Sequence, residues 1–129
     1  MTYYHEQLLK IKSEIYPHDY LCDQIIQAKL YIDKHYADNI NLHEISQAAL
    51  FSKFHFIRLF RKNYGRTPYQ YLTEVRIAKA KQLLKSDRTI SEVCYSVGFT
   101  SITSFTGLFK KITGITPSEF QKKSNIEED

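Results

Sequence analysis

Apolar residues recur at helical spacing along most of the chain. One stripe predicts a helix over residues 20–36 and consists of Leu21, Ile25, Ala28, Ile32 and Tyr36. A second stripe runs through residues 69–84, with Leu72, Val75, Ala80 and Leu83 expected to face inward. Because glycine (4) and proline (3) are few and alternating β patterns are rare, we predict an all-α protein.

A shorter stripe near the N-terminus predicts a helix over residues 3–16 and consists of Leu8, Ile11 and Ile15. Pro17 interrupts this helix. Packing on the rest of the domain is the favoured role for it. Binding to a partner, or a former connection to another domain, are the alternatives.

The stretch 52–65, SKFHFIRLFRKNYG, has a second copy 49 positions later at 101–114, SITSFTGLFKKITG. The residues that both copies keep include Ser52/Ser101, Phe56/Phe105, Phe60/Phe109 and Gly65/Gly114. A serine at the N-cap and a glycine at a left-handed C-cap delimit a helix in each copy. Since a short apolar segment and a turn precede both helices, the repeat predicts two helix-turn-helix subdomains.

Capping residues place the remaining helix ends. Asn41 and Glu44 have the spacing of a capping box before the first helix of the first subdomain, and Thr89 is expected to cap the matching helix of the second. Thr67 caps a long linker helix that starts at Pro68 and runs through Leu84. A last short helix begins at 116–117 and ends near 122. We expect about seven helices plus a short N-terminal helix.

The expected organisation has five parts. Residues 1–19 form an N-terminal extension, 20–66 the first helix-turn-helix subdomain and 67–86 the linker helix. Residues 87–123 form the second subdomain, and 124–129 fray as an acidic tail.

Charge is concentrated in the repeated region. The 129 residues carry a net charge of +4, but residues 40–123 alone hold 14 Lys/Arg against 5 Asp/Glu. A segment this basic commonly binds polyanions, although a solvated lysine-rich helical surface is the alternative. Cys22 and Cys94 do not make a disulfide framework, and neither a signal peptide nor a membrane-spanning run is found. We therefore expect a soluble protein of the cytoplasm.

The helix that begins at Ser52 presents a mixed outer face. Its inner face consists of Phe56, Leu59, Phe60 and Tyr64. Its outer face, which we expect to contact the bases of DNA, consists of Lys53, Phe54, Ile57 and Arg58. Arginine can bond guanine bidentately and an apolar side chain can touch the thymine methyl. Packing of Phe54 and Ile57 on a neighbouring helix, and a surface salt bridge at Arg58, are the alternatives.

In the second copy the expected core face is Phe105, Leu108, Phe109 and Ile112, and the expected base-reading residues are Ile102, Thr103, Thr106 and Gly107. Gly107 stands where the first copy has Arg58, so we expect weaker reading here. Contacts to the DNA backbone are expected from Ser52, Arg61, Lys62, Arg66, Ser101, Lys110 and Lys111.

Two other classes of function were considered. The five histidines have no metal-ligand spacing, no glycine-rich phosphate loop is present and no nucleophile has a recognisable base, so we expect no enzyme, no metal and no cofactor. A helical protein-interaction adaptor is the second hypothesis. Salt-insensitive binding to a protein would favour it, whereas steeply salt-dependent retention on DNA favours duplex DNA as the partner.

Residues 90–120, ISEVCYSVGFTSITSFTGLFKKITGITPSEF, resemble the C-terminal signature of AraC/XylS-type bacterial transcription regulators. The first half of the family pattern fits Ser52, Arg58, Phe60, Gly65, Tyr71, Arg76, Ala80, Leu83 and Leu84, and the resemblance covers residues 22–121. It implies seven helices in two helix-turn-helix subdomains joined by one long helix, with a recognition helix in each of two successive major grooves. The base-reading positions that it implies are Phe54, Ile57, Arg58, Ile102, Thr103 and Gly107.

Two residues depart from the family pattern. Gly107 replaces a polar residue or arginine, which weakens the expectation for the second half-site, and Cys94 replaces a buried alanine. The resemblance implies an activator that contacts RNA polymerase. It also implies either a stand-alone regulator, as in the MarA group, or a fragment that lacks an N-terminal effector or dimerisation domain.

Overall fold

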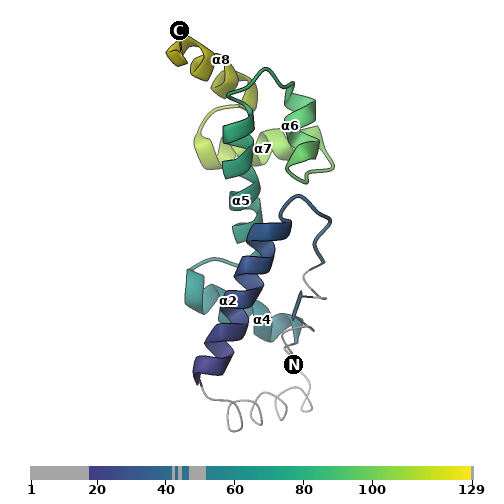
Figure 1. Ribbon diagram of the computed structural model, residues 1–129, viewed down its shortest axis with the longest axis vertical. Helices are drawn as coiled ribbons and strands as arrows, with labels where there is room; N and C mark the ends of the chain where they lie inside the picture. Colours follow the sequence, from purple (N-terminus) through teal and green to yellow (C-terminus); the bar gives the residue numbers. More distant parts are fainter. Residues whose placement is uncertain (1–17, 42, 44, 47–51, 129) are drawn as a thin grey trace. The chain divides into compact units, whose positions relative to one another are not determined.

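The computed structural model describes residues 18–41, 43, 45–46 and 52–128 (Figure 1). Its helices in these ranges are α2 (His18–His35), α4 (Lys53–Tyr64), α5 (Pro68–Leu83), α6 (Ile90–Ser96), α7 (Ile102–Thr113) and α8 (Pro117–Glu128). The described part contains no strand, so the all-α prediction is confirmed. The predicted helix over 3–16, and Glu44 of the predicted capping box, lie outside the described residues.

The described residues divide into two compact units. Unit 1 contains α2 as far as Lys34, α4, and the start of α5 as far as Tyr71. Unit 2 contains residues 35–39, the rest of α5, and α6, α7 and α8.

Phe60 of α4 lies at the centre of the unit 1 core and is fully buried. Its ring centroid is 5.9 Å from that of Phe56, 4.8 Å from that of Tyr64 and 5.7 Å from that of Tyr71. The buried face of α2 that completes this core consists of Ile25, Ala28 and Ile32. Three residues of the stripe predicted for α2 are therefore its buried face; the Leu21 side chain lies outside the described residues, and Tyr36 follows α2 and packs half-buried in unit 2.

The core of unit 2 is built around two phenylalanines of α7. Phe105 and Phe109 are fully buried with ring centroids 5.8 Å apart, and Phe120 of α8 lies 5.7 Å from Phe109. α5 contributes Ile77 and Ala80 to this core, and Leu84 follows directly after the helix; each is at most 1% exposed. Ile77 and Leu84 are fully buried whereas Val75 and Leu83 are half-buried, because the i, i+3, i+7 stripe that enters the core starts at Ile77.

The capping residues lie where they were predicted. Ser52 accepts a hydrogen bond from the backbone N–H of His55 and Ser101 accepts one from that of Ser104, both at 3.2 Å. Gly65 and Gly114 end the two helices with φ of 73° and 89°. These left-handed conformations carry a steric penalty for other residues, which is why glycine recurs there.

α8 is longer than predicted. The helix continues to Glu128 instead of ending near Lys122. Ser124 is buried on it, and Gln121 donates to the backbone oxygen of Arg88 at 2.7 Å. These contacts hold α8 against the loop after α5, so the segment expected to fray is helical.

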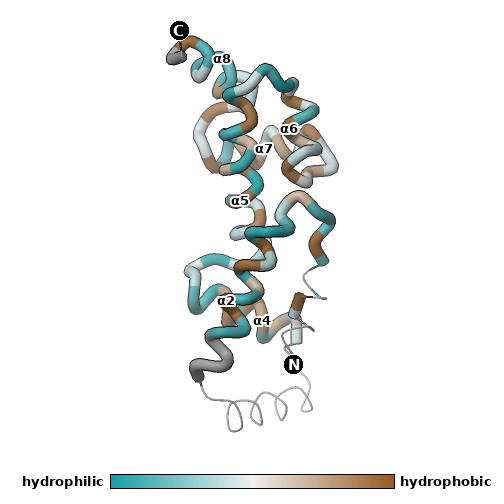
Figure 2. The backbone as a smooth tube through the Cα atoms, viewed as in Figure 1, coloured by the Kyte–Doolittle hydropathy of each residue, from teal (hydrophilic) through white to brown (hydrophobic). Residues whose placement is uncertain are grey.

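Hydrophilic and hydrophobic residues follow one another at short intervals along the described helices (Figure 2). Within the ranges that the structure describes, none of the helices combines the length and the apolar character needed to cross a bilayer.

Candidate nucleic-acid interface

α4 exposes one arc of side chains from unit 1. At 100° per residue, Phe54, Arg58 and Arg61 project within an arc of about 60°. Phe54 is 67% exposed and the two arginines are also exposed, whereas Ile57 at the edge of the arc is half-buried. The exposure of Phe54 argues against its packing on a neighbouring helix. An apolar ring thus lies beside two guanidinium groups on the solvent face of a capped helix.

Further basic side chains lie at the C-terminal end of this arc. Lys62 is in the last turn of α4, and Arg66 follows the glycine C-cap; both are exposed. Cations at a helix C-terminus are stabilised by the helix dipole and are well placed to reach phosphate. Lys53 is the first residue of α4, and its side chain lies outside the described residues.

A polar cluster joins α4 to its supporting helices in unit 1. Lys29 donates to Asp33 at 3.2 Å, and the hydroxyl of Tyr71 donates to the same carboxylate. The Lys29 ammonium lies 5.3 Å from the ring centroid of Tyr71 and 5.8 Å from that of Tyr64 in α4. Burial, followed by the bond to Asp33, raises the pKa of Tyr71, and hydrogen bonding to Tyr71 and Asp33 raises the pKa of Lys29.

Sequence reasoning missed this cluster. Tyr71 stands out in the sequence only as a family position and as the match of Phe120 at the repeat offset of 49, and Asp33 lies 38 residues away from it. The available signal was a polar hydroxyl at a position where the second copy has a plain phenyl ring.

α7 exposes the matching arc from unit 2. Thr103, Gly107 and Lys110 occupy the helical positions that Phe54, Arg58 and Arg61 occupy in α4. All three are exposed, Ile102 is 38% exposed at the helix start, and Thr106 is half-buried. Lys111 is exposed in the last turn, and Ser101 is half-buried at the N-cap. The second arc is therefore smaller and less charged than the first.

Packing does not require glycine at position 107. A Cβ built on Gly107 meets no heavy atom within 4 Å, and the backbone there is helical. The contrast between Arg58 and Gly107 is thus a difference between two surfaces and not between two cores.

The turn before α7 is fixed by a contact that the sequence did not reveal. Arg76 of α5 donates from Nε to the backbone oxygen of Tyr36 at 2.7 Å and from Nη2 to that of Asp38 at 3.1 Å. Its guanidinium also lies 5.5 Å from the ring centroid of Phe99. A Cβ on Gly98, whose φ is 102°, would lie 2.8 Å from that Tyr36 oxygen. Glycine is therefore required at this turn for both its conformation and its size.

Among the described residues, no three His, Cys, Asp or Glu side chains are grouped to hold a metal ion. Cys94 is a free, buried thiol in the core of unit 2, and its burial raises the pKa of the thiol. In a packed core this residue acts as a small apolar side chain.

In unit 2 a short helix, a glycine turn and a capped helix with a basic last turn form a helix-turn-helix. α4 of unit 1 matches its second helix in register at the N-cap serine, the two core phenylalanines and the C-cap glycine. This arrangement defines the class of helix-turn-helix DNA-binding transcription regulators. A family described as "helix-turn-helix domain" matches residues 45–123, and the chain belongs to this AraC-type family.

Individual relatives agree with this assignment. The chain is 34% identical over 99 residues to the bifunctional transcriptional activator/DNA repair enzyme AdaA of Bacillus subtilis. The match covers 76% of this chain and 47% of AdaA. The chain spans 47% of AdaA and 37% of the probable transcriptional regulator LumQ of Photobacterium leiognathi, to which it is also 34% identical, over 92 residues that make up 70% of this chain.

Solved structures show the same fold. The C-terminal domain of the response regulator yesN from Fusobacterium nucleatum has 30% identity and a TM-score of 0.70, with 74% of this chain and 94% of that domain covered. The DNA-binding domain of the global transcriptional factor AdpA, solved with a target DNA, has 25% identity and a TM-score of 0.76, with 80% and 94% covered.

Proposed function

We propose that this chain is a sequence-specific, double-stranded DNA-binding regulator that inserts α4 and α7 into successive major grooves and activates transcription. The observation that carries the proposal is the exposed arc of Phe54, Arg58 and Arg61 on α4, repeated in register on α7. An exposed arginine beside an apolar ring has the chemistry to bond guanine and to touch a thymine methyl. The solved complex of the AdpA domain with a target DNA supports the same use of this fold.

The two helices have different roles in this proposal. The α4 arc, including Lys53 and Ile57, supplies most of the base reading. α7 reads weakly through Ile102, Thr103 and Thr106 and acts mainly as a clamp. Phosphates are bound by the basic side chains at the ends of both helices and at the serine N-caps, namely Arg61, Lys62, Arg66, Lys110, Lys111, Ser52 and Ser101.

The activating role has support from the name of AdaA, which is called a transcriptional activator. We propose that the chain acts in the bacterial cytoplasm without catalytic activity of its own, contacts RNA polymerase, and can be joined to an effector or dimerisation domain, since it spans only part of its relatives.

Selection of bound sequences from a random duplex pool tests the proposal, followed by affinities of Arg58→Ala on the selected duplex and on random duplex. We expect Arg58→Ala to lose about 1 to 3 kcal/mol of binding free energy on the selected duplex and less on random duplex, because a base contact is lost. Lys62→Ala is the matched control. This variant should bind both duplexes more weakly and by the same factor, and the slope of log affinity against log salt should fall in magnitude by about one.

Two outcomes would contradict the proposal. Equal losses for Arg58→Ala on both duplexes would make Arg58 a phosphate contact only. Recovery of no sequence motif, together with binding that salt does not weaken, would exclude sequence-specific duplex binding.

A further inference from the structure

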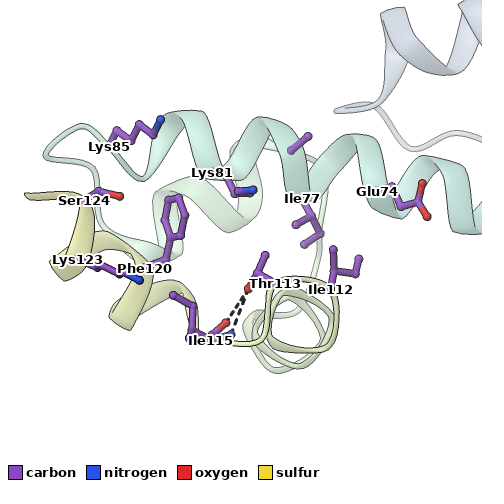
Figure 3. Close-up of a pocket in the computed structure, with 11 residues that line it drawn as sticks. Glu74, Ile77, Lys81, Lys85, Ile112, Thr113, Ile115, Phe120, Lys123 and Ser124 are labelled. Carbon is purple, nitrogen blue, oxygen red and sulfur yellow. Dashed lines mark hydrogen bonds between the residues drawn. The ribbon is translucent and has the colours of Figure 1, made fainter. Parts of the chain in front are cut away.

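A groove in unit 2 lies apart from the reading residues. It has a volume of about 660 Å³, lies among α5, α7 and α8, and is open to solvent on one side (Figure 3). Its apolar lining comes from Ile77, Ile112, Ile115 and Phe120. The Thr113 side chain links α7 to the loop at the base of the groove, because its hydroxyl donates to the Phe109 oxygen at 2.8 Å and accepts from the Ile115 N–H at 3.3 Å. The groove is therefore a formed feature of the fold.

Ile112 was predicted to belong to the core, and that prediction was wrong. It lies on the helical stripe that continues from Phe105 and Phe109, but it is 46% exposed and lines the groove. The core of unit 2 closes one turn earlier, at Phe109 and Phe120, so the last apolar residue of the stripe is left without a buried partner. Exposed apolar surface of this kind can bind an apolar side chain at about 25 cal/mol per Å² buried.

Three lysines border the groove. Lys81 and Lys85 lie one turn apart on α5 and its C-terminal extension, and Lys123 comes from α8 (Figure 3). In the part of the chain that the structure describes, none of the three is within ion-pair distance of a carboxylate. Lys81 instead lies 5.9 Å from the ring centroid of Phe120. Glu74 also lines the groove, at the opposite end from Lys85 and Lys123 (Figure 3), so the positive charges border the apolar surface away from Glu74, and a ligand complementary to them is acidic and amphipathic.

The length of the groove favours a peptide segment. From Glu74 at one end to Lys85 at the other it follows α5 and the turn after it over eleven residue-to-residue steps, which at helical rise is about 16 Å or three turns. An open groove of this length with an apolar floor suits the helix-in-groove mode, in which one apolar face of a helix is buried and its flanks meet the rim.

The groove and the reading arc lie on different sides of α7. At 100° per residue, Ile112 projects about 140° from Gly107 and about 160° from Lys110. A chain that contacts DNA through Gly107 and Lys110 therefore keeps Ile112 and the groove accessible.

We propose that this groove binds an acidic amphipathic helix of a partner protein, with its apolar side chains on Ile112, Ile115 and Phe120 and its carboxylates at Lys81, Lys85 and Lys123. The inference goes beyond DNA binding and does not require it. It assigns unit 2 a second surface, which recognises protein.

The test uses the full chain and a labelled peptide of about 16 residues, with leucines at i, i+3, i+4 and i+7 spacing, glutamates on both flanks and alanines elsewhere. We expect saturable binding by fluorescence anisotropy, with amide chemical-shift changes at Ile112, Ile115 and Phe120. A peptide of the same composition with dispersed leucines, and one with lysines in place of glutamates, should bind at least about tenfold more weakly.

Charge reversal provides matched variants. Lys85→Glu and Lys123→Glu should each weaken peptide binding about fivefold, as expected when an exposed attraction becomes a repulsion. Lys122→Glu is the control, since Lys122 is exposed on α8 next to Lys123 and does not line the groove. All three should keep the helical circular dichroism of the wild type. Affinity for duplex DNA is measured separately, so a failure of the DNA proposal is distinguishable from a failure of this one.

Several results would overturn the inference. These are an equal loss in Lys122→Glu, equal binding of the control peptides, or shift changes at Phe54 and Gly107 in place of the groove residues. Shift changes at the groove with dodecanoate but not with the peptide would assign it to a small amphiphilic anion. Concentration-dependent dimerisation that Ile112→Asp abolishes would assign it to a second copy of the chain.

Discussion

Replacing Gly107 by alanine should stabilise unit 2 by about 1 kcal/mol, because glycine in a helix interior costs that much relative to alanine. Gly107 is the sixth of the twelve residues of α7, so it lies in the interior and not at a cap. Its backbone is helical, and an added Cβ meets no heavy atom within 4 Å, so no steric term opposes the gain. The midpoint of thermal unfolding should rise by about 3 to 5 °C.

Gly98→Ala is the matched comparison, because the same methyl group is added in the same unit. Gly98 has a φ of 102°, and its Cβ would lie 2.8 Å from the Tyr36 oxygen and 2.9 Å from Arg76 Nε. A left-handed conformation of this kind costs about 1 to 3 kcal/mol for a residue with a side chain, and the backbone contact adds to that. We expect a loss of at least about 2 kcal/mol.

Urea denaturation followed by circular dichroism measures both changes in unfolding free energy. The comparison holds if each variant has the same slope of unfolding free energy against urea concentration as the wild type. A loss of stability in Gly107→Ala would refute the reasoning, since it would mean that the space around Gly107 is occupied or that α7 is not helical there. Duplex affinity of the same variant adds a separate result. A gain in stability together with a loss of DNA binding would show that the DNA backbone approaches Gly107 closely.

Two further substitutions test the contacts that hold the units. Arg76→Met removes charged hydrogen bonds to two backbone oxygens and should lower the unfolding free energy by about 2 to 3 kcal/mol in urea; a loss below about 0.5 kcal/mol would mean that these bonds do not hold the turn before α7. The pKa of Tyr71 is raised above its ordinary 10.0, so its stabilising effect is complete below pH 10.0 and is lost as the pH rises through the folded-state value. Tyr71→Phe should therefore lose less stability than the wild type above pH 10.0, measured by urea denaturation at each pH; an equal alkaline loss in both proteins would contradict a titrating Tyr71.

The helix limits could be predicted because their causes are local. Ser52 bonds an N–H three residues later, and Gly65 accepts a conformation that its own lack of a side chain permits. The hydrogen bonds of Arg76 and Tyr71 could not be predicted, because each joins residues about forty positions apart and depends on packing that no short window of sequence contains. Ile112 shows the same limit, since helical periodicity shows which face a residue lies on but not where the partner helices stop covering that face.

The repeat separates what the fold requires from what recognition uses. Phenylalanines, N-cap serines and C-cap glycines recur because each copy must bury one face of a helix and end it at the same point. The outer positions carry no such requirement, and Gly107, with open space around it, occupies the place of Arg58 without any change in the core. Side chains on these arcs can therefore be exchanged one at a time without disturbing the core. If the proposed function is right, an arginine introduced at position 107 should raise duplex affinity while the unfolding transition keeps its slope, and abolished binding would instead indicate close approach of the DNA backbone.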